Sequence, residues 1–341
     1  VVGHDPFHIE RLWRRVYGAG YTQRPDVSLV SILSALEMAC WDIIGKACDK
    51  PVFELLGGQV HERLRSYTYI YPSKGDVYPN KSDDDHVYVN PDRAAERALD
   101  YVAQGFTAVK FDPAGPYTVF DGGMPTGAEL DRSEAFTRRI REAVGGEIDL
   151  LFGTHGQFSP AGAIRLAKRL EPLDPLWFEE PVPPDNIQAM ARVAGSTSIP
   201  IATGERLCTK YEFAQVLQDN AASILQLNLG RVGGLLEAKK IAALAEVHHA
   251  QLAPHMYCGP IVGAANIQLA TCSPNFLILE GIERWTGFQA ELLDKPVIWQ
   301  DGYVIPSSQP GLGVSLNEAV ARAHPWEGND LHLEMGQDPV R

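Results

Sequence analysis

Several features are missing from this 341-residue sequence, and each absence excludes a class of protein. No stripe of basic residues is present and the formal net charge is −13, so we expect no nucleic-acid partner. No apolar run approaches the ~20 residues needed to cross a bilayer. The N-terminal residues show no signal-peptide pattern, so we expect a cytoplasmic protein with no membrane partner. No G-x-G-x-x-G follows a first strand, which disfavours a dinucleotide-binding fold.

Cysteine is also scarce. The five cysteines are an odd number and form no C-x-x-C pair; they are Cys40, Cys48, Cys208, Cys258 and Cys272. This usage predicts no disulfide framework and no zinc site, and it is typical of a reduced, cytoplasmic protein.

What the sequence does contain is a long alternation of strand-like and helix-like segments. The strand-like runs are residues 65–71, 107–111, 148–152, 176–178, 199–202, 223–227, 251–253 and 276–279. The helix-like runs between them are residues 91–103, 132–143, 160–170, 186–194, 210–218, 235–248 and 260–270. Eight such strands predict a parallel sheet closed into a (β/α)8 TIM barrel over residues 63–285, with an open doubly wound sheet as the alternative.

The two ends of the chain differ from this middle part. Residues 1–62 are helical in character, with helical spacing over Ile9–Tyr17 and over Ser28–Ala47, where Ser28 is the expected N-cap. The turn at Leu56–Gly58 marks the domain boundary.

The C-terminal residues 286–341 lose the alternation, and Asp301–Gly302 predicts a hairpin. We expect this segment to pack on residues 1–62, so that the two ends form one α+β capping domain. Two long loops, residues 72–90 and 113–131, follow the first and second strands, and we interpret them as lids over the C-terminal face of the barrel.

Two glutamates stand at the ends of neighbouring strand-like runs. Glu179 follows Leu176–Phe178 and Glu205 follows Ile199–Ala202, with a helix-length segment between them. Parallel strands joined by a helix end at the same edge of a sheet, so the two carboxylates converge. Such a pair binds a hard divalent cation such as Mg²⁺. The alternative is that both are ordinary surface acids.

Other strand ends also carry polar residues: Lys110 and Asp112, His155, Asn228, His255 and Glu280. Two acids can hold a cation that stabilises negative charge on a substrate carboxylate, while Lys110, His155 and His255 can exchange protons. This equipment suits removal of a proton α to a carboxylate, with formation of an enediolate and loss of a β-hydroxyl as water.

The motifs WFEEP (177–181), ATGER (202–206), ILQLNLGRVGG (224–234) and APHMYCGP (253–260) resemble the mandelate racemase branch of the enolase superfamily. Residues 35–58 resemble the capping domain of that branch. The similarity runs from about residue 5 to the end, and the usual first hairpin of the capping domain is absent from the sequence given.

The resemblance implies roles for individual residues. Glu179 and Glu205 match metal ligands for Mg²⁺, or Mn²⁺, and Glu180 and Asn228 support the site. Lys110 and His255 match the proton-transferring residues, and His155 matches a histidine of the sugar-acid dehydratases. The expected substrate-binding residues are Tyr21, Arg24, Asp112, Arg206 and Glu280.

Two positions depart from the family pattern. Gly153 stands where the first metal ligand, an Asp, is usual, and we expect a water, or alternatively His155, to replace it. Asn228 stands where an Asp usually orients the strand-seven histidine. An amide can fix a histidine tautomer but cannot stabilise an imidazolium by charge, so His255 is expected to be a weaker base.

The sequence thus predicts a Mg²⁺-dependent hydro-lyase for a sugar acid of the galactarate or galactonate kind, forming a 2-keto-3-deoxy acid. An epimerase, racemase or cycloisomerase of the same family is the alternative. Less favoured are a retaining glycosidase that uses Glu179 and Glu205 as its acid pair, and a degenerate barrel without activity. We expect a homo-oligomer that acts on a small molecule.

Overall fold

The computed structural model describes residues 2–19, 21, 23–72, 87–112 and 122–325. Residues 73–86 and 113–121, which belong to the two long loops expected to act as lids, lie outside the described residues.

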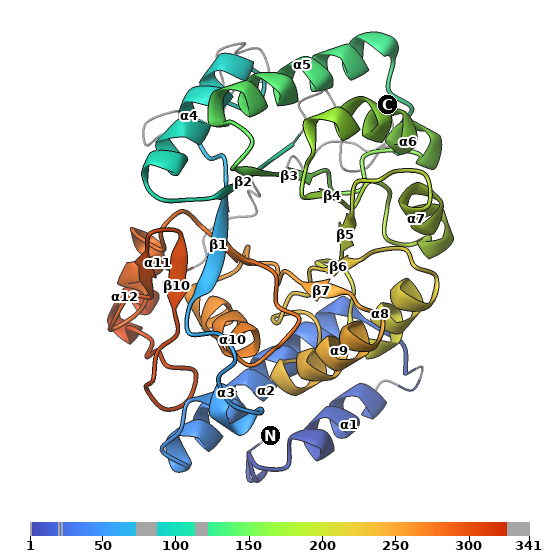
Figure 1. Ribbon diagram of the computed structural model, residues 1–341. Coiled ribbons are helices and arrows are strands. Elements are labelled where there is room, and N and C mark those ends of the chain that lie inside the picture. Colours follow the sequence, from blue (N-terminus) through green and yellow to red (C-terminus); the bar gives the residue numbers. More distant parts are fainter. Residues whose placement is uncertain (1, 20, 22, 73–86, 113–121, 326–341) are drawn as a thin grey trace.

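Eight parallel strands form the barrel predicted from the sequence (Figure 1). They are β1 (Leu64–Tyr69), β2 (Ala108–Phe111), β3 (Asp149–Gly153), β4 (Trp177–Glu179), β5 (Ile201–Thr203), β6 (Ile224–Leu225), β7 (Gln251–Leu252) and β8 (Leu279–Gly281). Strands β1 to β7 pair in chain order, and β8 pairs with β1. A parallel bridge between Leu252 and Phe276 completes the ring.

Helices surround the strands, as expected for βα units. They are α4 (Pro91–Ala103), α5 (Gly127–Val144), α6 (Pro160–Leu170), α7 (Ile187–Ala194), α8 (Thr209–Gln218), α9 (Leu235–Val247) and α10 (Pro260–Thr271), with a short 3₁₀ turn at Glu171–Leu173. Local sequence explains where several begin. Asn90 and Ser159 cap α4 and α6, each just before a proline, and Thr126 and Glu129 form a capping box for α5.

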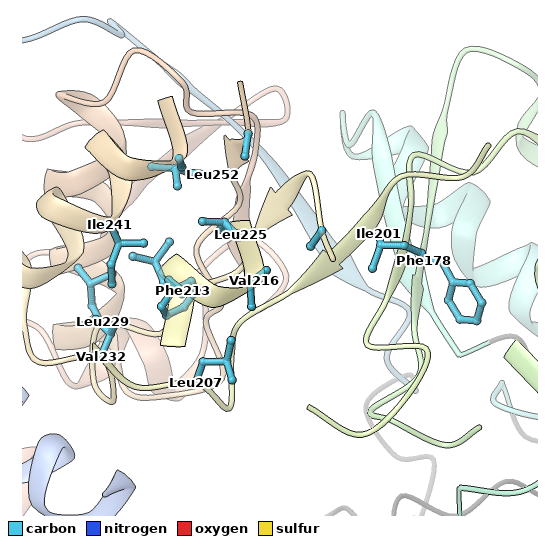
Figure 2. Packing of buried hydrophobic residues seen from close by; sticks show 14 of the residues in the cluster. Phe178, Ile201, Leu207, Phe213, Val216, Leu225, Leu229, Val232, Ile241 and Leu252 are labelled. Carbon is cyan, nitrogen blue, oxygen red and sulfur yellow. The ribbon is translucent and has the colours of Figure 1, made fainter. Parts of the chain in front are cut away.

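The barrel interior is a packed layer rather than a pore, with each strand region contributing to it. The buried residues of this layer are Tyr67, Ala108, Leu151, Trp177, Ala202, Ile224, Ala253 and Ile278. A larger apolar core lies between strands and helices, where Leu225 of β6 packs with Phe213 of α8 and Ile241 of α9 (Figure 2). Together these two cores fix the strand ends that carry the polar residues.

The N-terminal part contains α1 (Ile9–Ala19), α2 (Val27–Ala47) and α3 (Val52–Leu55). The predicted N-cap at Ser28 is wrong. Asp26 is the cap, and its carboxylate accepts the Leu29 N–H over 2.9 Å. Val27 already has helical geometry, so Ser28 falls inside the first turn.

A buried carboxylate of helix α2 forms hydrogen bonds with the barrel helix α9. Glu37 accepts the backbone N–H groups of Leu235 (2.7 Å) and Leu236 (2.9 Å), which open α9, and the indole N–H of Trp41 (2.8 Å). The two backbone donors belong to the first turn of α9, where N–H groups have no partner within their own helix. Burial raises the pKa of Glu37 to about 7, although all three donors lower it.

Helix α2 also passes a length and composition test for a membrane span, contrary to the expectation that no run is long and apolar enough. The core helix of a soluble protein passes the same test. Val30, Leu33, Glu37 and Ile44 of α2 are buried within the protein, so one face of the helix belongs to the core, whereas Ile32 and Ile43 are exposed.

After β8 the chain forms α11 (Phe288–Glu291), the hairpin β9 (Ile298–Gln300) and β10 (Tyr303–Ile305), and α12 (Glu318–Ala323). Asp301–Gly302 makes the hairpin turn, as predicted. Strand β10 pairs antiparallel with the start of β1. Farther on, Leu312 N–H donates to Asp42 of α2 over 3.0 Å, so the segment contacts both the barrel and α2.

Candidate active site

The strand register brings the predicted polar residues to one end of the barrel. Phe111 pairs with Phe152, Gly153 with Glu179, and Glu179 with Ala202. The residues that follow these positions therefore stand around one mouth, at the C-terminal ends of the strands, where TIM-barrel enzymes carry their active sites.

Lys110 is the buried cation of this mouth. Its Nζ lies 2.8 Å from Oε2 of Glu179 and 3.2 Å from Oε1 of Glu280, and the side chain is 2% exposed. Burial alone lowers the pKa of Lys110, but the two carboxylates outweigh burial and hold the pKa well above its usual range. Lys110 is therefore an ammonium at neutral pH.

Glu179 accepts hydrogen bonds from both Lys110 and Gln226, and the side-chain amide of Gln226 donates to Oε2 over 2.7 Å. Burial raises the pKa of Glu179; Lys110 lowers it, and the Glu205 and Glu280 carboxylates raise it further. Sequence reasoning missed Gln226, although the signal was present. Gln226 stands two residues before Asn228, so alternation puts both on one face of the strand region.

Gly153 provides space for the lysine. A Cβ at this position would lie 2.7 Å from Cε of Lys110 and 3.5 Å from a ring carbon of Tyr69. A side chain at residue 153 therefore requires Lys110 to move.

Glu205 has a lowered pKa although it is buried. Burial raises its pKa, but His255, His155 and Lys110 outweigh burial and lower the pKa to about 2. Nε2 of His255 lies 3.1 Å from Oε2 of Glu205. The contact lacks hydrogen-bond geometry, so Oε2 has no hydrogen-bond partner among the described residues.

Asn228 fixes the tautomer of His255. The Gly230 N–H donates to Oδ1 of Asn228 over 2.8 Å, which orients the amide. Nδ2 of Asn228 then faces Nδ1 of His255 at 2.8 Å and donates to it. Because Nδ1 accepts, the ring proton of the neutral histidine is on Nε2, the nitrogen that faces Glu205.

Two further carboxylates stand at the mouth, one in β8 and one just after β4. Glu280 accepts the Met256 N–H over 2.7 Å in addition to Lys110. Glu180 pairs with Arg206, whose Nη2 lies 2.7 Å from Oε2. Burial raises the pKa of Glu180 to about 7; Glu205 raises it as well, and Arg206 opposes both.

Asp112 follows β2 and His155 follows β3, which is the neighbouring strand. His155 has φ of 51°, a left-handed conformation that costs energy in a non-glycine residue and is often found at functional sites. Thr154 holds this turn by donating its hydroxyl to the Glu179 carbonyl over 2.7 Å. The hydroxyl of Tyr69 donates to Oδ2 of Asp112 over 2.9 Å.

Two predicted substrate-binding residues are not brought to this mouth. Tyr21 is 99% exposed, and Arg24 is exposed beside it, between α1 and α2. No hydrogen bond or ion pair within the described part of the chain joins either residue to the strand ends. Their role stays a prediction.

The donor set suits a divalent cation. Four buried carboxylates (Glu179, Glu180, Glu205 and Glu280) lie beside two lysine or arginine cations, Lys110 and Arg206. Oε2 of Glu205 and Oε1 of Gln226 are buried without hydrogen-bond partners among the described residues. Within that part of the chain no group of three or more His, Cys, Asp or Glu is arranged to hold a metal. A cation here would take two carboxylates from the protein and its other ligands from water and substrate, as Mg²⁺ commonly does.

The fold and this mouth define an enolase-type barrel with an N-terminal capping part. Residues 93–320 match the enolase C-terminal domain-like family, and residues 1–57 match the N-terminal domain of the mandelate racemase and muconate lactonizing enzyme family. The chain belongs to the mandelate racemase/muconate lactonizing enzyme family of the enolase superfamily, which confirms the resemblance seen in the sequence.

The chain is similar over nearly its whole length to solved structures and to curated proteins. A crystal structure described as a mandelate racemase/muconate lactonizing enzyme from Labrenzia alexandrii DFL-11 is 66% identical, with a TM-score of 0.91, covering 97% of this chain and 82% of that one. D-galactonate dehydratase of Ralstonia pickettii (strain 12J) is 35% identical over 97% of this chain and 82% of its own length. D-gluconate dehydratase of Thermoproteus tenax is 31% identical over 99% of this chain, which spans 65% of that protein.

Proposed function

We propose that this protein is a hydro-lyase that dehydrates a sugar acid, an aldonate or aldarate of the galactonate or galactarate kind, to a 2-keto-3-deoxy acid. The observation that carries the proposal is the buried ammonium of Lys110 between Glu179 and Glu280, with His155 and His255 at the same mouth. The names of the galactonate and gluconate dehydratases support this substrate class.

Glu179, Glu205 and Lys110 would act on the substrate carboxylate. Glu179 and Glu205 would hold a Mg²⁺ or Mn²⁺ ion, which when bound supplies Lewis-acid stabilisation of negative charge on the substrate. The ammonium of Lys110 binds the same carboxylate and stabilises the charge that develops after the α proton has left. Since Lys110 is held charged, its role is electrostatic unless it first loses a proton.

His255, on the other face of the reacting carbon, is then the base that removes the α proton. In the tautomer that the Asn228 contact favours, Nε2 carries a proton and cannot accept another. Nε2 becomes a base when the Asn228 amide rotates to present Oδ1 to a proton on Nδ1, at the expense of the hydrogen bond from Gly230. This requirement makes proton abstraction by His255 slower than with a carboxylate at residue 228.

His155 acts as the acid in the elimination, and the bonds and protons of the step balance as follows. The electrons of the Cα–H bond move into the enediolate and then form the double bond as the β C–O bond breaks. The departing hydroxyl takes a proton from His155 and leaves as water, and the enol product becomes the 2-keto acid. The epimerase, racemase or cycloisomerase alternative shares the first step and lacks the loss of water.

The test is a screen of aldonates and aldarates with Mg²⁺, in which semicarbazide detects keto products. We expect a keto product from at least one six-carbon sugar acid, and loss of activity with EDTA that added Mg²⁺ restores. An epimer or lactone without a keto product would establish the alternative activity. Turnover of aryl or amino acids only would contradict the proposed substrate class.

A further inference from the structure

Gln226 follows β6 and carries a buried side chain that reaches across part of the barrel mouth. Its backbone N–H donates to the Thr203 carbonyl of β5 over 2.8 Å. Its side chain is fully buried, and Nε2 donates to Oε2 of Glu179, at the end of β4, over 2.7 Å. Because β5 lies between β4 and β6, the side chain crosses the end of β5, the strand that leads to Glu205. The amide group therefore lies between the strand ends that carry the two expected metal ligands.

The contact with Glu179 also decides which way the amide oxygen of Gln226 faces. An ionised carboxylate only accepts hydrogen bonds, so the amide nitrogen faces Glu179 and the oxygen faces away from it. This oxygen, Oε1, is buried and has no hydrogen-bond partner in the described part of the chain. Buried polar atoms are nearly always paired, so the unpaired oxygen marks the place of a partner that is not a described protein atom.

Glu205 supplies a second oxygen of the same kind. Its Oε2 is also buried without a hydrogen-bond partner among the described residues, although Nε2 of His255 lies 3.1 Å away. Two acceptors at neighbouring strand ends, one on a carboxylate and one on an amide, thus lack donors. Carboxylate and carbonyl oxygens together are the ligands that suit Mg²⁺ and Mn²⁺.

Protein donors of the barrel interior do not satisfy the amide oxygen. The indole N–H of Trp177 and the hydroxyl of Tyr67 belong to the same interior layer as Ile224, two residues before Gln226. Both are buried, and neither has a hydrogen-bond partner in the part of the chain that the structure describes. A water bound to Oε1 is the remaining alternative to a cation, and metal-binding measurements separate the two.

We propose that the amide oxygen of Gln226 is a ligand of the divalent cation, together with Glu179 and Glu205. It takes one of the positions otherwise left to water, and it supplies from β6 the third protein ligand that Gly153 does not supply from β3. The inference rests on the metal site of the proposed function and is independent of the dehydration steps. As a neutral, hard ligand, an amide oxygen favours Mg²⁺ or Mn²⁺ over the metals that prefer imidazole.

Metal affinity is the first measurement. Gln226→Leu removes the amide oxygen and should weaken Mg²⁺ binding by about tenfold or more in isothermal titration. Gln188→Leu is the matched control. Gln188 is an exposed amide of α7 that donates to Asp219 over 3.0 Å, and its loss should leave the affinity unchanged. An unchanged affinity in Gln226→Leu overturns the inference.

The number of water molecules on the metal distinguishes a ligand from a positioning residue. Losing the hydrogen bond to Glu179 would also weaken metal binding, so affinity alone does not decide. ENDOR spectroscopy in ¹⁷O-labelled water counts the waters on bound Mn²⁺. Gln226→Leu should gain one, because water takes the vacated position. A weaker affinity with an unchanged number of waters overturns the inference, since Gln226 would then only position Glu179.

The wild-type protein allows a measurement that does not depend on the folding of a variant. With ¹³C at the glutamine Cδ atoms, ENDOR of bound Mn²⁺ should detect a carbon within about 3.5 Å, as a direct metal–oxygen–carbon link requires. A glutamine that reaches the metal only through a water would lie beyond about 4 Å. The short-range signal should vanish in Gln226→Glu, which keeps the shape of the side chain and carries no glutamine label.

The remaining outcomes separate the ligand from the proposed function. A wild-type protein that gives no short-range signal, or that binds neither Mg²⁺ nor Mn²⁺, overturns the inference, and so does a signal that persists in Gln226→Glu. A short-range signal in a protein that dehydrates no sugar acid would leave the ligand standing and reject only the proposed function. Dehydration without the signal would reject only the ligand.

Discussion

Asn228 donates its side-chain amide to Nδ1 of His255 over 2.8 Å, and so it places the ring proton of that histidine on Nε2. Where the family has a carboxylate at this position, the carboxylate would instead accept from Nδ1 and leave Nε2 free to take a proton. A change of one carboxylate to an amide therefore reverses which end of the ring can act as a base.

The first prediction concerns this pair. Asn228→Asp should speed α-proton exchange in D₂O by about tenfold, because the carboxylate accepts from Nδ1 and stabilises the imidazolium. Deuterium incorporation into the recovered substrate measures the effect. Asn186→Asp is the control, since Asn186 caps α7 with its side-chain oxygen and Asp is an equally good cap. An exchange rate that falls or stays unchanged in Asn228→Asp would mean that His255 is not the base.

The second prediction concerns the buried ammonium. Lys110→Met should lower kcat by about 10³-fold, in line with the loss of an electrostatic donor to the developing charge. Circular dichroism and thermal unfolding should still show a folded barrel, since methionine fills the volume of the lysine stem. A variant with kcat within tenfold of wild type would show that Lys110 does not contact the reacting carboxylate.

Much of this arrangement was predictable because strand alternation is a local property. Lys110 and Asp112 stand two residues apart at one strand end, and the structure places both at the mouth. What could not be predicted is set by atoms distant in sequence. The tautomer of His255 depends on the backbone N–H of Gly230, which orients Asn228. The charge of Lys110 depends on carboxylates from β4 and β8.

Errors at element ends have the same origin. Ser28 and Asp26 are both good capping residues, and the choice between them depends on where the first helical turn closes, which packing decides. The helical spacing over Ser28–Ala47 did not reveal that Glu37 is buried. Its actual partners are Leu235 and Leu236, almost two hundred residues away.

The third prediction follows from that buried carboxyl. The pKa of Glu37 is about 7 in the folded protein and about 4.5 in the unfolded chain, so the folded state binds the proton more tightly. The free energy of unfolding therefore falls as pH rises from about 4.5 to 7, by up to about 3 kcal/mol for this one group. Glu37→Gln keeps one acceptor oxygen, which can serve Leu236 and Trp41, and should remove this pH-dependent loss.

The measurement is the midpoint of urea unfolding at pH 5, 6, 7 and 8 for wild type and Glu37→Gln. The difference between the two proteins isolates Glu37 from Glu180 and other titrating groups. It should grow in favour of the variant as pH rises through this range. Parallel curves would show that Glu37 is ionised in both states.

The fourth prediction concerns the metal and tests the space at Gly153. Gly153→Asp should tighten Mg²⁺ binding by about tenfold, because a third carboxylate joins Glu179 and Glu205. The same change should lower kcat, because its Cβ would lie 2.7 Å from Cε of Lys110 and displaces the ammonium.

Gly153→Ala is the matched control, since it displaces Lys110 equally and adds no ligand. Isothermal titration with Mg²⁺ and Mn²⁺ should therefore show tighter binding in the Asp variant only, and both variants should turn over more slowly. Equal affinities in all three proteins, together with unchanged activity in Glu205→Gln, would reject Glu179 and Glu205 as the metal ligands.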